Sequence, residues 1–225
     1  MIRPNSTLAG LLAWIVTLIV PIVLALGVVR LGAVFAPPFL QYEYNSPGFP
    51  ADPYGFTTQD RLKWSMIDLN YLENDQGISF LGDLRFENGT PVYNERELSH
   101  MVDVKNTLHM VMNVWYGSLV LLFVLGIWAW FGGWMPAFRH GMSRGGWLTV
   151  FLILGILLFV LLSFGVFFVY FHEVFFAPGT WTFYFSDTLI RLFPERFWRD
   201  IFLVIGSLTL LSGLAVAFLF RYRST

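Results

Sequence analysis

Four apolar runs constrain this sequence more than any other feature. They cover residues 8–29, 110–131, 147–171 and 201–220. Each is close to the roughly 20 residues that a helix needs to cross the hydrocarbon core of a membrane. The composition agrees, because 56% of the 225 residues are hydrophobic and only 13% are charged, which is too apolar for an ordinary soluble domain. The sequence therefore predicts an all-α membrane protein built on a bundle of four transmembrane helices.

The charged residues predict how the chain is oriented in the membrane. All fifteen Asp and Glu residues lie in residues 36–109 and 172–200, whereas the N-terminus, residues 132–146 and the C-terminal tail carry Arg and no acidic residue. Arg and Lys in short segments beside spans mark the cytoplasmic side. Both termini are therefore predicted to be cytoplasmic in a multi-pass protein of the cell membrane, with residues 36–109 and 172–200 outside.

This division predicts three regions. Residues 1–36 form the first transmembrane helix with a cytoplasmic N-terminus, and its apolar run is too long for the core of a cleaved signal peptide. Residues 37–108 form an extracytoplasmic cap. Residues 109–225 hold three further transmembrane helices and an aromatic extracytoplasmic loop at 172–200.

The cap is predicted to be small and of mixed α/β structure. Thr57 and Asp60 have the spacing of a capping box and predict a helix over 59–72. Residues 78–94 resemble a hairpin with a tight turn at Asn88 and Gly89. The proline-rich segment 36–56 predicts an irregular, aromatic-lined lead-in.

A charged segment, ELSHMVDVK, lies at residues 97–105, directly before the second span. Asn94 and Glu97 have capping spacing and predict a helix that continues into that span. At about 100° per residue, Glu97, His100 and Asp103 share one face, while His109 lies on the opposite side. His100 is therefore the candidate functional histidine of this helix.

A second candidate histidine, His172, lies where the third span is predicted to leave the membrane on the outer side. The segment that follows it is rich in aromatic residues, among them Trp181, and these residues either line a pocket or form a membrane-interface belt. Because His100 and His172 are predicted at the same level, their imidazoles are expected to converge.

The sequence lacks the motifs that several kinds of catalytic or metal-binding site require. The chain has no cysteine and hence no thiolate nucleophile, and it lacks the H-E-x-x-H and G-x-S-x-G motifs. His100 and Asp103 alone are two ligands at a common spacing, so no metal or cofactor is predicted. The formal net charge of −1 gives no indication of a nucleic-acid partner. General acid–base catalysis by histidine on a lipid-borne substrate remains.

Two motifs, E-L-S-H-M-V-D-V-K at 97–105 and F-H-x-x-x-F followed by W-x-F-x-x-x-D-x-L-I-x-L-F-P-x-x-F-W over 171–198, resemble the lipoprotein intramolecular transacylase family of bacterial four-span membrane proteins. The resemblance implies an enzyme that moves an acyl chain from the sn-2 position of a lipoprotein's diacylglyceryl group to the amino group of its N-terminal cysteine. It also implies that His100 and His172 are the catalytic residues, and that the partners are a diacylated lipoprotein and membrane lipid.

Such a reaction fits a chain without a serine or cysteine nucleophile, because the substrate brings its own amine. One histidine would deprotonate this amine, and the other would stabilise the oxyanion or protonate the leaving oxygen; the sequence does not distinguish the two. Asp103 and Asp187 are candidates to orient the imidazoles, with Glu97 and Trp181 as further supporting residues. Two alternatives stay open: a noncatalytic membrane partner of a transporter or lipoprotein-handling complex, and a phospholipid hydrolase.

Overall fold

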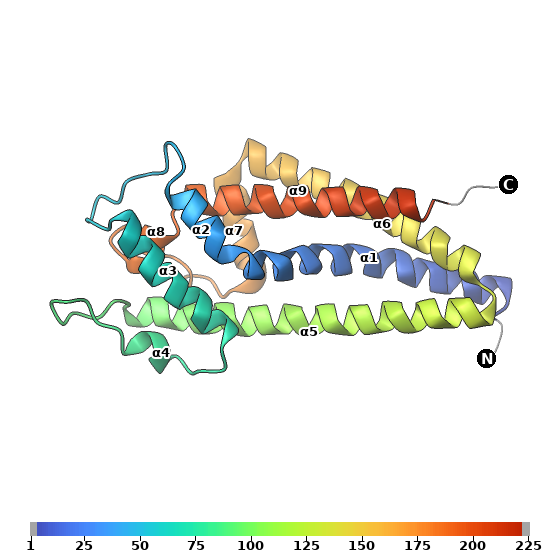
Figure 1. Ribbon diagram of the computed structural model, residues 1–225, viewed down its shortest axis with the longest axis horizontal. Helices are drawn as coiled ribbons and strands as arrows, with labels where there is room; N and C mark the ends of the chain where they lie inside the picture. Colours follow the sequence, from blue (N-terminus) through green and yellow to red (C-terminus); the bar gives the residue numbers. More distant parts are fainter. Residues whose placement is uncertain (1–3, 222–225) are drawn as a thin grey trace. The chain divides into compact units, whose positions relative to one another are not determined.

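The protein is helical throughout the residues that the structure describes. A computed structural model describes residues 4–221, which form nine helices: α1 (Ser6–Val34), α2 (Ala36–Tyr44), α3 (Thr58–Glu73), α4 (Ser79–Gly82), α5 (Glu95–Gly132), α6 (Met135–Leu162), α7 (Phe164–Phe175), α8 (Thr188–Leu192) and α9 (Glu195–Leu219) (Figure 1). Within this range α1, α5, α6 and α9 are long and apolar enough to cross a membrane. The predicted all-α protein with four spans is therefore confirmed.

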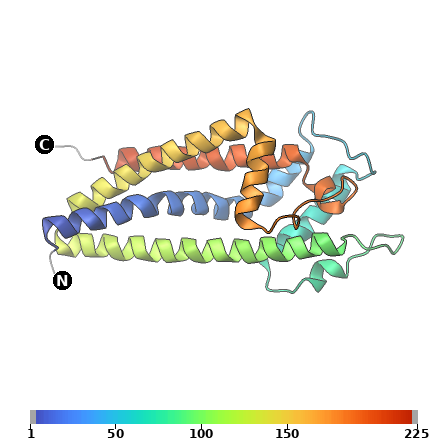
Figure 2. The same cartoon turned by 180° about the vertical axis from the view of Figure 1, so that it is seen from behind.

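The chain divides into two compact units. In the described range, unit 1 consists of residues 4–31, 111–162 and 202–221, and its helices run side by side in both Figure 1 and Figure 2. An apolar cluster that includes Val16, Leu125 and Phe138 forms its core. Unit 1 thus contains most of the apolar length of α1, α5, α6 and α9.

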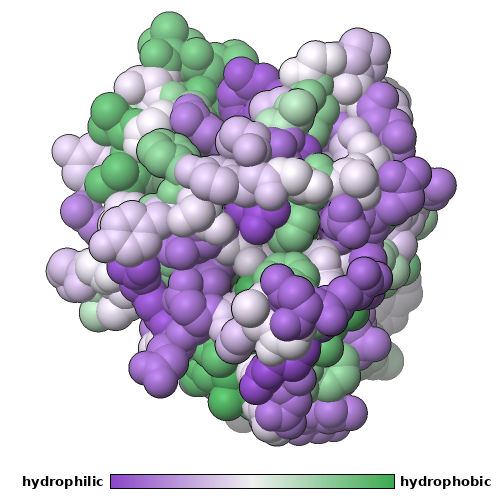
Figure 3. Space-filling view, turned by 90° about the vertical axis from the view of Figure 1, so that its left-hand side faces the viewer, coloured by the Kyte–Doolittle hydropathy of each residue, from purple (hydrophilic) through white to green (hydrophobic). Residues whose placement is uncertain are grey.

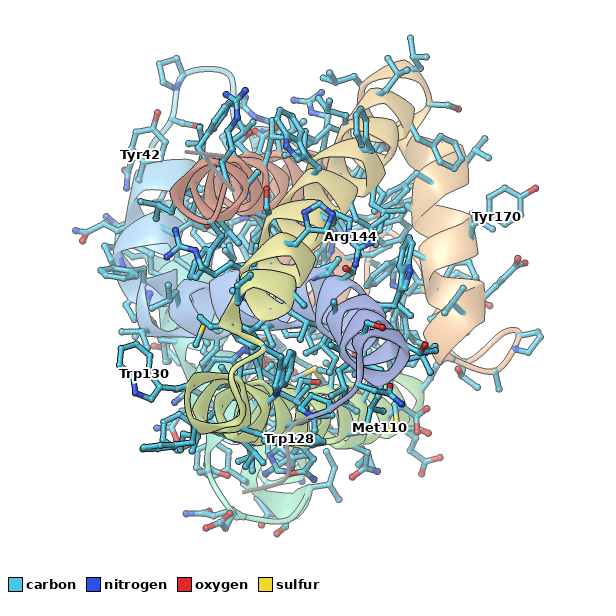
Figure 4. The ribbon with its side chains drawn as sticks, turned by 90° about the vertical axis from the view of Figure 1, so that its right-hand side faces the viewer. Tyr42, Met110, Trp128, Trp130, Arg144 and Tyr170 are labelled. Carbon is cyan, nitrogen blue, oxygen red and sulfur yellow. The ribbon has the colours of Figure 1, made fainter. Side chains whose placement is uncertain are left out.

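Glycines let α6 pack closely against α1 and α9 in unit 1. A Cβ atom on Gly141 would lie 2.5 Å from the carbonyl oxygen of Ala13, and one on Gly146 would lie 2.5 Å from the backbone nitrogen of Ala217. Small residues at such contacts are typical of helix pairs in membranes, where close backbone approach provides the packing. Large apolar side chains instead face outward, as Trp130 on α5 does (Figure 4), with 72% of its surface exposed.

Unit 2 consists of residues 32–110 and 163–201. It contains all fifteen acidic residues of the chain, and the face shown in Figure 3 is largely hydrophilic. One apolar cluster surrounds Trp64, Tyr71 and Leu192, and a second surrounds Leu40 and Phe197. Unit 2 therefore has a core of its own.

Two capping arrangements begin helices of unit 2 as predicted. At α3 the Thr57 side chain accepts a hydrogen bond from the backbone N–H of Asp60, and the Asp60 carboxylate accepts one from the N–H of Thr57. Before α5, the Asn94 side chain accepts from the N–H of Glu97, and the Glu97 carboxylate accepts from the N–H of Asn94. The predicted uninterrupted helix from the 97–105 segment into the second span is confirmed as α5.

The predicted α/β character of the cap is wrong. The structure forms the turn at Asn88 and Gly89, with Gly89 at a φ of 83°, but residues 4–221 contain no strand, only an isolated bridge between Arg85 and Pro91. Proline has no N–H to donate, so it cannot extend a ladder. On the N-terminal side of the turn, α4 extends to Gly82, so few extended residues remain that could pair as a strand.

Two other predicted segments also differ from the structure. Residues 36–44 form α2 rather than an irregular lead-in, because the prolines stand at the first helical positions, where no N–H is required. The third predicted span, 147–171, is not one helix: α6 starts earlier and ends at Leu162, and Ser163 adopts a non-helical conformation (φ −157°, ψ 69°) before α7. No proline stands near this break, and the nearest glycine is Gly165, two residues after Ser163.

Candidate functional site

His100 and His172 lie together inside unit 2. His100 is in the second turn of α5, before its apolar part, and His172 is in the last turn of α7. Their ring centroids are 6.3 Å apart with an interplanar angle of 24°, and each residue is only 8% exposed. The structure thus brings the two predicted histidines into one buried pair.

Aromatic rings enclose this pair. Phe176 and Phe183 meet the His100 ring edge to face, at centroid distances of 5.0 and 5.3 Å. Trp181 lies 4.8 Å and Phe168 4.0 Å from the ring of His172. Three of these rings come from residues 176–187, the connection between α7 and α8, which runs beside the first turns of α5 in Figures 1 and 2. The connection thus forms one wall of an apolar site.

A hydrogen bond within α7 fixes the tautomer of His172. Its Nδ1 lies 2.8 Å from the backbone carbonyl oxygen of Phe168, one helical turn earlier. A carbonyl oxygen can only accept, so Nδ1 carries the proton, and in the neutral ring Nε2 keeps a free lone pair. Nε2 is therefore the nitrogen of His172 that can take up a proton.

The enclosure also favours the neutral form of both rings. Burial, with a smaller contribution from the neighbouring His172, lowers the pKa of His100 to about 4. Burial likewise lowers the pKa of His172, against the opposite effect of its hydrogen bond to Phe168. Both imidazoles are accordingly uncharged at neutral pH, the form in which a histidine acts as a base.

Among the described residues, the three predicted carboxylates form no hydrogen bond with the imidazoles. Glu97, only 1% exposed, accepts hydrogen bonds from the backbone N–H groups of Asn94 and Leu189 at 2.9 and 2.7 Å. Asp187 accepts from the Asn94 side chain and from the backbone N–H of Tyr184. The structure shows no hydrogen bond from either ring to Asp103 within the described range. Glu97 and Asp187 thus attach the 176–187 connection to the start of α5.

The remaining histidines, His109 and His140, are not buried as the pair is. Both side chains are exposed, and for His109 the helical phase predicted a position away from His100. No group of three or more His, Asp or Glu side chains with metal-binding geometry occurs in residues 4–221.

Sequence reasoning missed two features of unit 2. The first is the role of the Phe168 carbonyl, which the spacing of four residues before a helical histidine could have indicated. The second is Asp68, a carboxyl 1% exposed that accepts a hydrogen bond from the Tyr93 hydroxyl at 2.7 Å. Burial raises the pKa of Asp68 to about 8, and the charge of Glu97 adds to the effect, while the Tyr93 bond opposes it.

Asp68 should make the stability of the protein depend on pH. Its pKa is higher in the folded state than in the unfolded chain, so its contribution is fully present at acidic pH and is lost as the pH rises toward 8. Between about pH 7 and 8, where the histidines of the unfolded chain are mostly neutral, the free energy of unfolding should fall by up to about 1.4 kcal/mol per pH unit from this group. Thermal unfolding of the protein in detergent at several pH values measures this dependence of stability on pH.

Asp68→Asn should flatten this dependence, and Asp75→Asn, at an exposed position, should leave it unchanged. An equally steep loss of stability in Asp68→Asn would assign the titration to another group.

Comparison with known proteins places the chain among its relatives. The family model described as "Lipoprotein intramolecular transacylase Lit" matches residues 14–198. The chain belongs to this family. As a lipoprotein intramolecular transacylase it is a transferase, and the family acts on lipoproteins in the membrane. An uncharacterized protein of Aquifex aeolicus is 32% identical over 191 residues, which cover 82% of each chain.

Solved structures of this family share the fold. The membrane-integral lipoprotein intramolecular transacylase of Bacillus cereus matches with a TM-score of 0.76 at 20% identity, covering 97% of this chain and 96% of the other. A variant of that enzyme with one histidine replaced by arginine matches with a TM-score of 0.68 at 21% identity, covering 97% and 94%. At such identities the likeness concerns the fold of the transacylase alone.

Proposed function

We propose that this transacylase moves an acyl chain from the sn-2 position of a lipoprotein's diacylglyceryl group to the amino group of its N-terminal cysteine, and so produces the lyso form. The buried pair of His100 and His172, with its fixed tautomer, is the observation that carries the proposal. A neutral base inside an apolar enclosure is what an amine nucleophile requires, because the amine must lose a proton as it attacks.

In the proposed reaction the substrate amine attacks the carbonyl carbon of the sn-2 ester. The new C–N bond forms, Nε2 of His172 takes the proton from the attacking nitrogen, and a tetrahedral intermediate results. The C–O bond to the glyceryl group then breaks. The proton that His172 holds passes to the leaving oxygen, which becomes a hydroxyl, so the reaction is an isomerisation that needs no water.

His172 is the base because its Nδ1–H is held by the Phe168 carbonyl, which leaves Nε2 as the only nitrogen able to accept. His100 has a buried Nδ1 with no hydrogen-bond partner among the described residues, so this nitrogen is left for the substrate. A proton on Nδ1 donates a hydrogen bond to the leaving oxygen as negative charge develops there. His172 then moves the proton, and His100 stabilises the charge.

The aromatic walls suit a reaction that depends on folding the substrate. Amine and ester belong to one molecule, and holding them in contact can remove a large part of the activation free energy that the reaction has in solution. Phe176, Phe183 and Trp181 present rigid apolar surfaces to the glyceryl and acyl parts, and their exclusion of water protects the ester from hydrolysis.

The proposed location follows from the charges. We place the protein in a bacterial cytoplasmic membrane, with both termini inside and the site outside, because unit 2 contains every acidic residue while Arg139 and Arg144 lie in unit 1. Residues 37–108 and the 172–200 loop then form the extracytoplasmic cap.

A synthetic diacyl lipopeptide tests this function. The purified protein should convert it to a product of the same total mass, because the reaction is an isomerisation, but the product should no longer react with an amine-labelling reagent. Tandem mass spectrometry should place the acyl chain on the cysteine nitrogen. Release of free fatty acid would indicate a hydrolase instead, and unchanged lipopeptide would favour a noncatalytic role.

A further inference from the structure

Trp181 carries a buried hydrogen-bond donor beside the histidine pair. Its ring lies 4.8 Å from that of His172, and its Nε1 is buried without a hydrogen-bond partner within residues 4–221. The indole of Trp115 in unit 1, in contrast, donates to the carbonyl oxygen of Val23 at 3.1 Å. The donor of Trp181 is therefore left unused by the folded chain.

An unpaired buried N–H costs stability, since the group has lost its hydrogen bond to water without gaining another. A phenylalanine at position 181 would enclose the same site without an unpaired N–H, and phenylalanines already provide most of the rings around the histidine pair. One other buried indole, Trp134, also lacks a partner, but it packs between Trp128 and Phe138 in the core of unit 1. Trp181 differs because it lies against a titratable ring in the site.

The chemical properties of the Trp181 indole N–H indicate which group it can bind. An indole N–H can donate but not accept, and it does not ionise, so it suits an oxygen that gains negative charge. We propose that Trp181 is a further catalytic residue, whose Nε1–H binds the carbonyl oxygen of the sn-2 ester and stabilises the oxyanion of the tetrahedral intermediate. This inference rests on the proposed transacylase reaction.

The distances allow this division of roles. The attacking nitrogen and the carbonyl oxygen are substituents of the same carbon in the intermediate, so their partners must stand close together. His172 and Trp181 do so, with 4.8 Å between ring centroids. His172 then serves the nitrogen, Trp181 the carbonyl oxygen and His100 the leaving oxygen.

Replacing the Trp181 side chain with benzothienylalanine tests the donor itself, because sulfur takes the place of the N–H in a ring of nearly the same shape. With the diacyl lipopeptide, kcat should fall by about 10²- to 10³-fold, the usual effect of losing one oxyanion donor, while KM changes little. Trp181→Phe should show the same loss in kcat. Trp134→Phe, which also removes an unpaired indole N–H, should keep the parental rate.

A binding measurement is independent of turnover. A phosphonate analogue of the lipopeptide presents a tetrahedral, negatively charged centre, and it should move the ¹⁵N–¹H signal of the Trp181 indole downfield. Trp181→Phe assigns this signal by its absence. Parental kcat in the benzothienylalanine variant, or a Trp181 signal unmoved by bound phosphonate, would overturn the proposal. If the parent protein failed to convert the lipopeptide, the transacylase reaction would be refuted, and the phosphonate titration would still decide whether Trp181 is an anion donor.

Discussion

Replacing His172 with alanine should lower the rate of acyl transfer by about 10²- to 10⁴-fold, the usual range for losing a general base. The reason is that alanine removes Nε2, the ring nitrogen that remains free to accept a proton while the Phe168 carbonyl holds the Nδ1 proton. The rate is measured as the loss of amine reactivity of a diacyl lipopeptide under saturating conditions. His100→Ala should also reduce kcat, because the leaving oxygen loses its donor.

His109→Ala is the matched control. His109 lies on the same helix as His100 but is exposed, so this variant should retain the parental rate. Retained thermal stability of His172→Ala would show that the loss concerns chemistry rather than folding. Parental transfer by His172→Ala would exclude the proposed base and point to proton transfer by a different group.

Replacing Glu97 with alanine should lower the free energy of unfolding by about 2–6 kcal/mol. The buried carboxylate accepts hydrogen bonds from the backbone N–H groups of Asn94 and Leu189, and its removal leaves both donors unpaired, at a cost of about 1–3 kcal/mol each. Leu189 lies in α8, at the end of the connection that carries Trp181, so transfer should weaken as well. Chemical or thermal unfolding of the purified protein in detergent measures the loss.

Glu95→Ala provides the comparison, because Glu95 stands in the same first turn of α5 but is exposed. It should change the unfolding free energy by less than about 0.5 kcal/mol, as expected for a surface substitution. If Glu97→Ala were no less stable than Glu95→Ala, the link between α5 and α8 would contribute nothing to the fold.

The features predicted correctly from the sequence depend on local patterns. The apolar runs gave the four spans, and the pairs Thr57–Asp60 and Asn94–Glu97 gave the starts of α3 and α5, because capping involves residues three positions apart. The shared helical face also singled out His100 over His109. Each of these inferences needs only the geometry of one helix.

The features that were missed depend on contacts between distant segments or on small local choices of backbone. The apolar run continues through Ser163 and Gly165, so these two residues alone did not mark the end of α6. The predicted hairpin is absent because α4 includes residues that its first strand would need. Asp187 was expected to orient an imidazole, but it bonds to Asn94, 93 positions away. The burial of Asp68 likewise results from packing against Tyr93 and is invisible in its own helix.

The hydrogen bond between His172 and Phe168 has a consequence for movement during turnover. A lipoprotein substrate must enter the site and its product must leave. The connection over residues 176–187 is the part of the aromatic enclosure that is not helical. Both partners of this hydrogen bond belong to α7, so displacement of that wall would admit substrate without exchanging the proton between the two ring nitrogens. The protein would then return to the same protonation pattern after each cycle, ready for the next substrate without any resetting step.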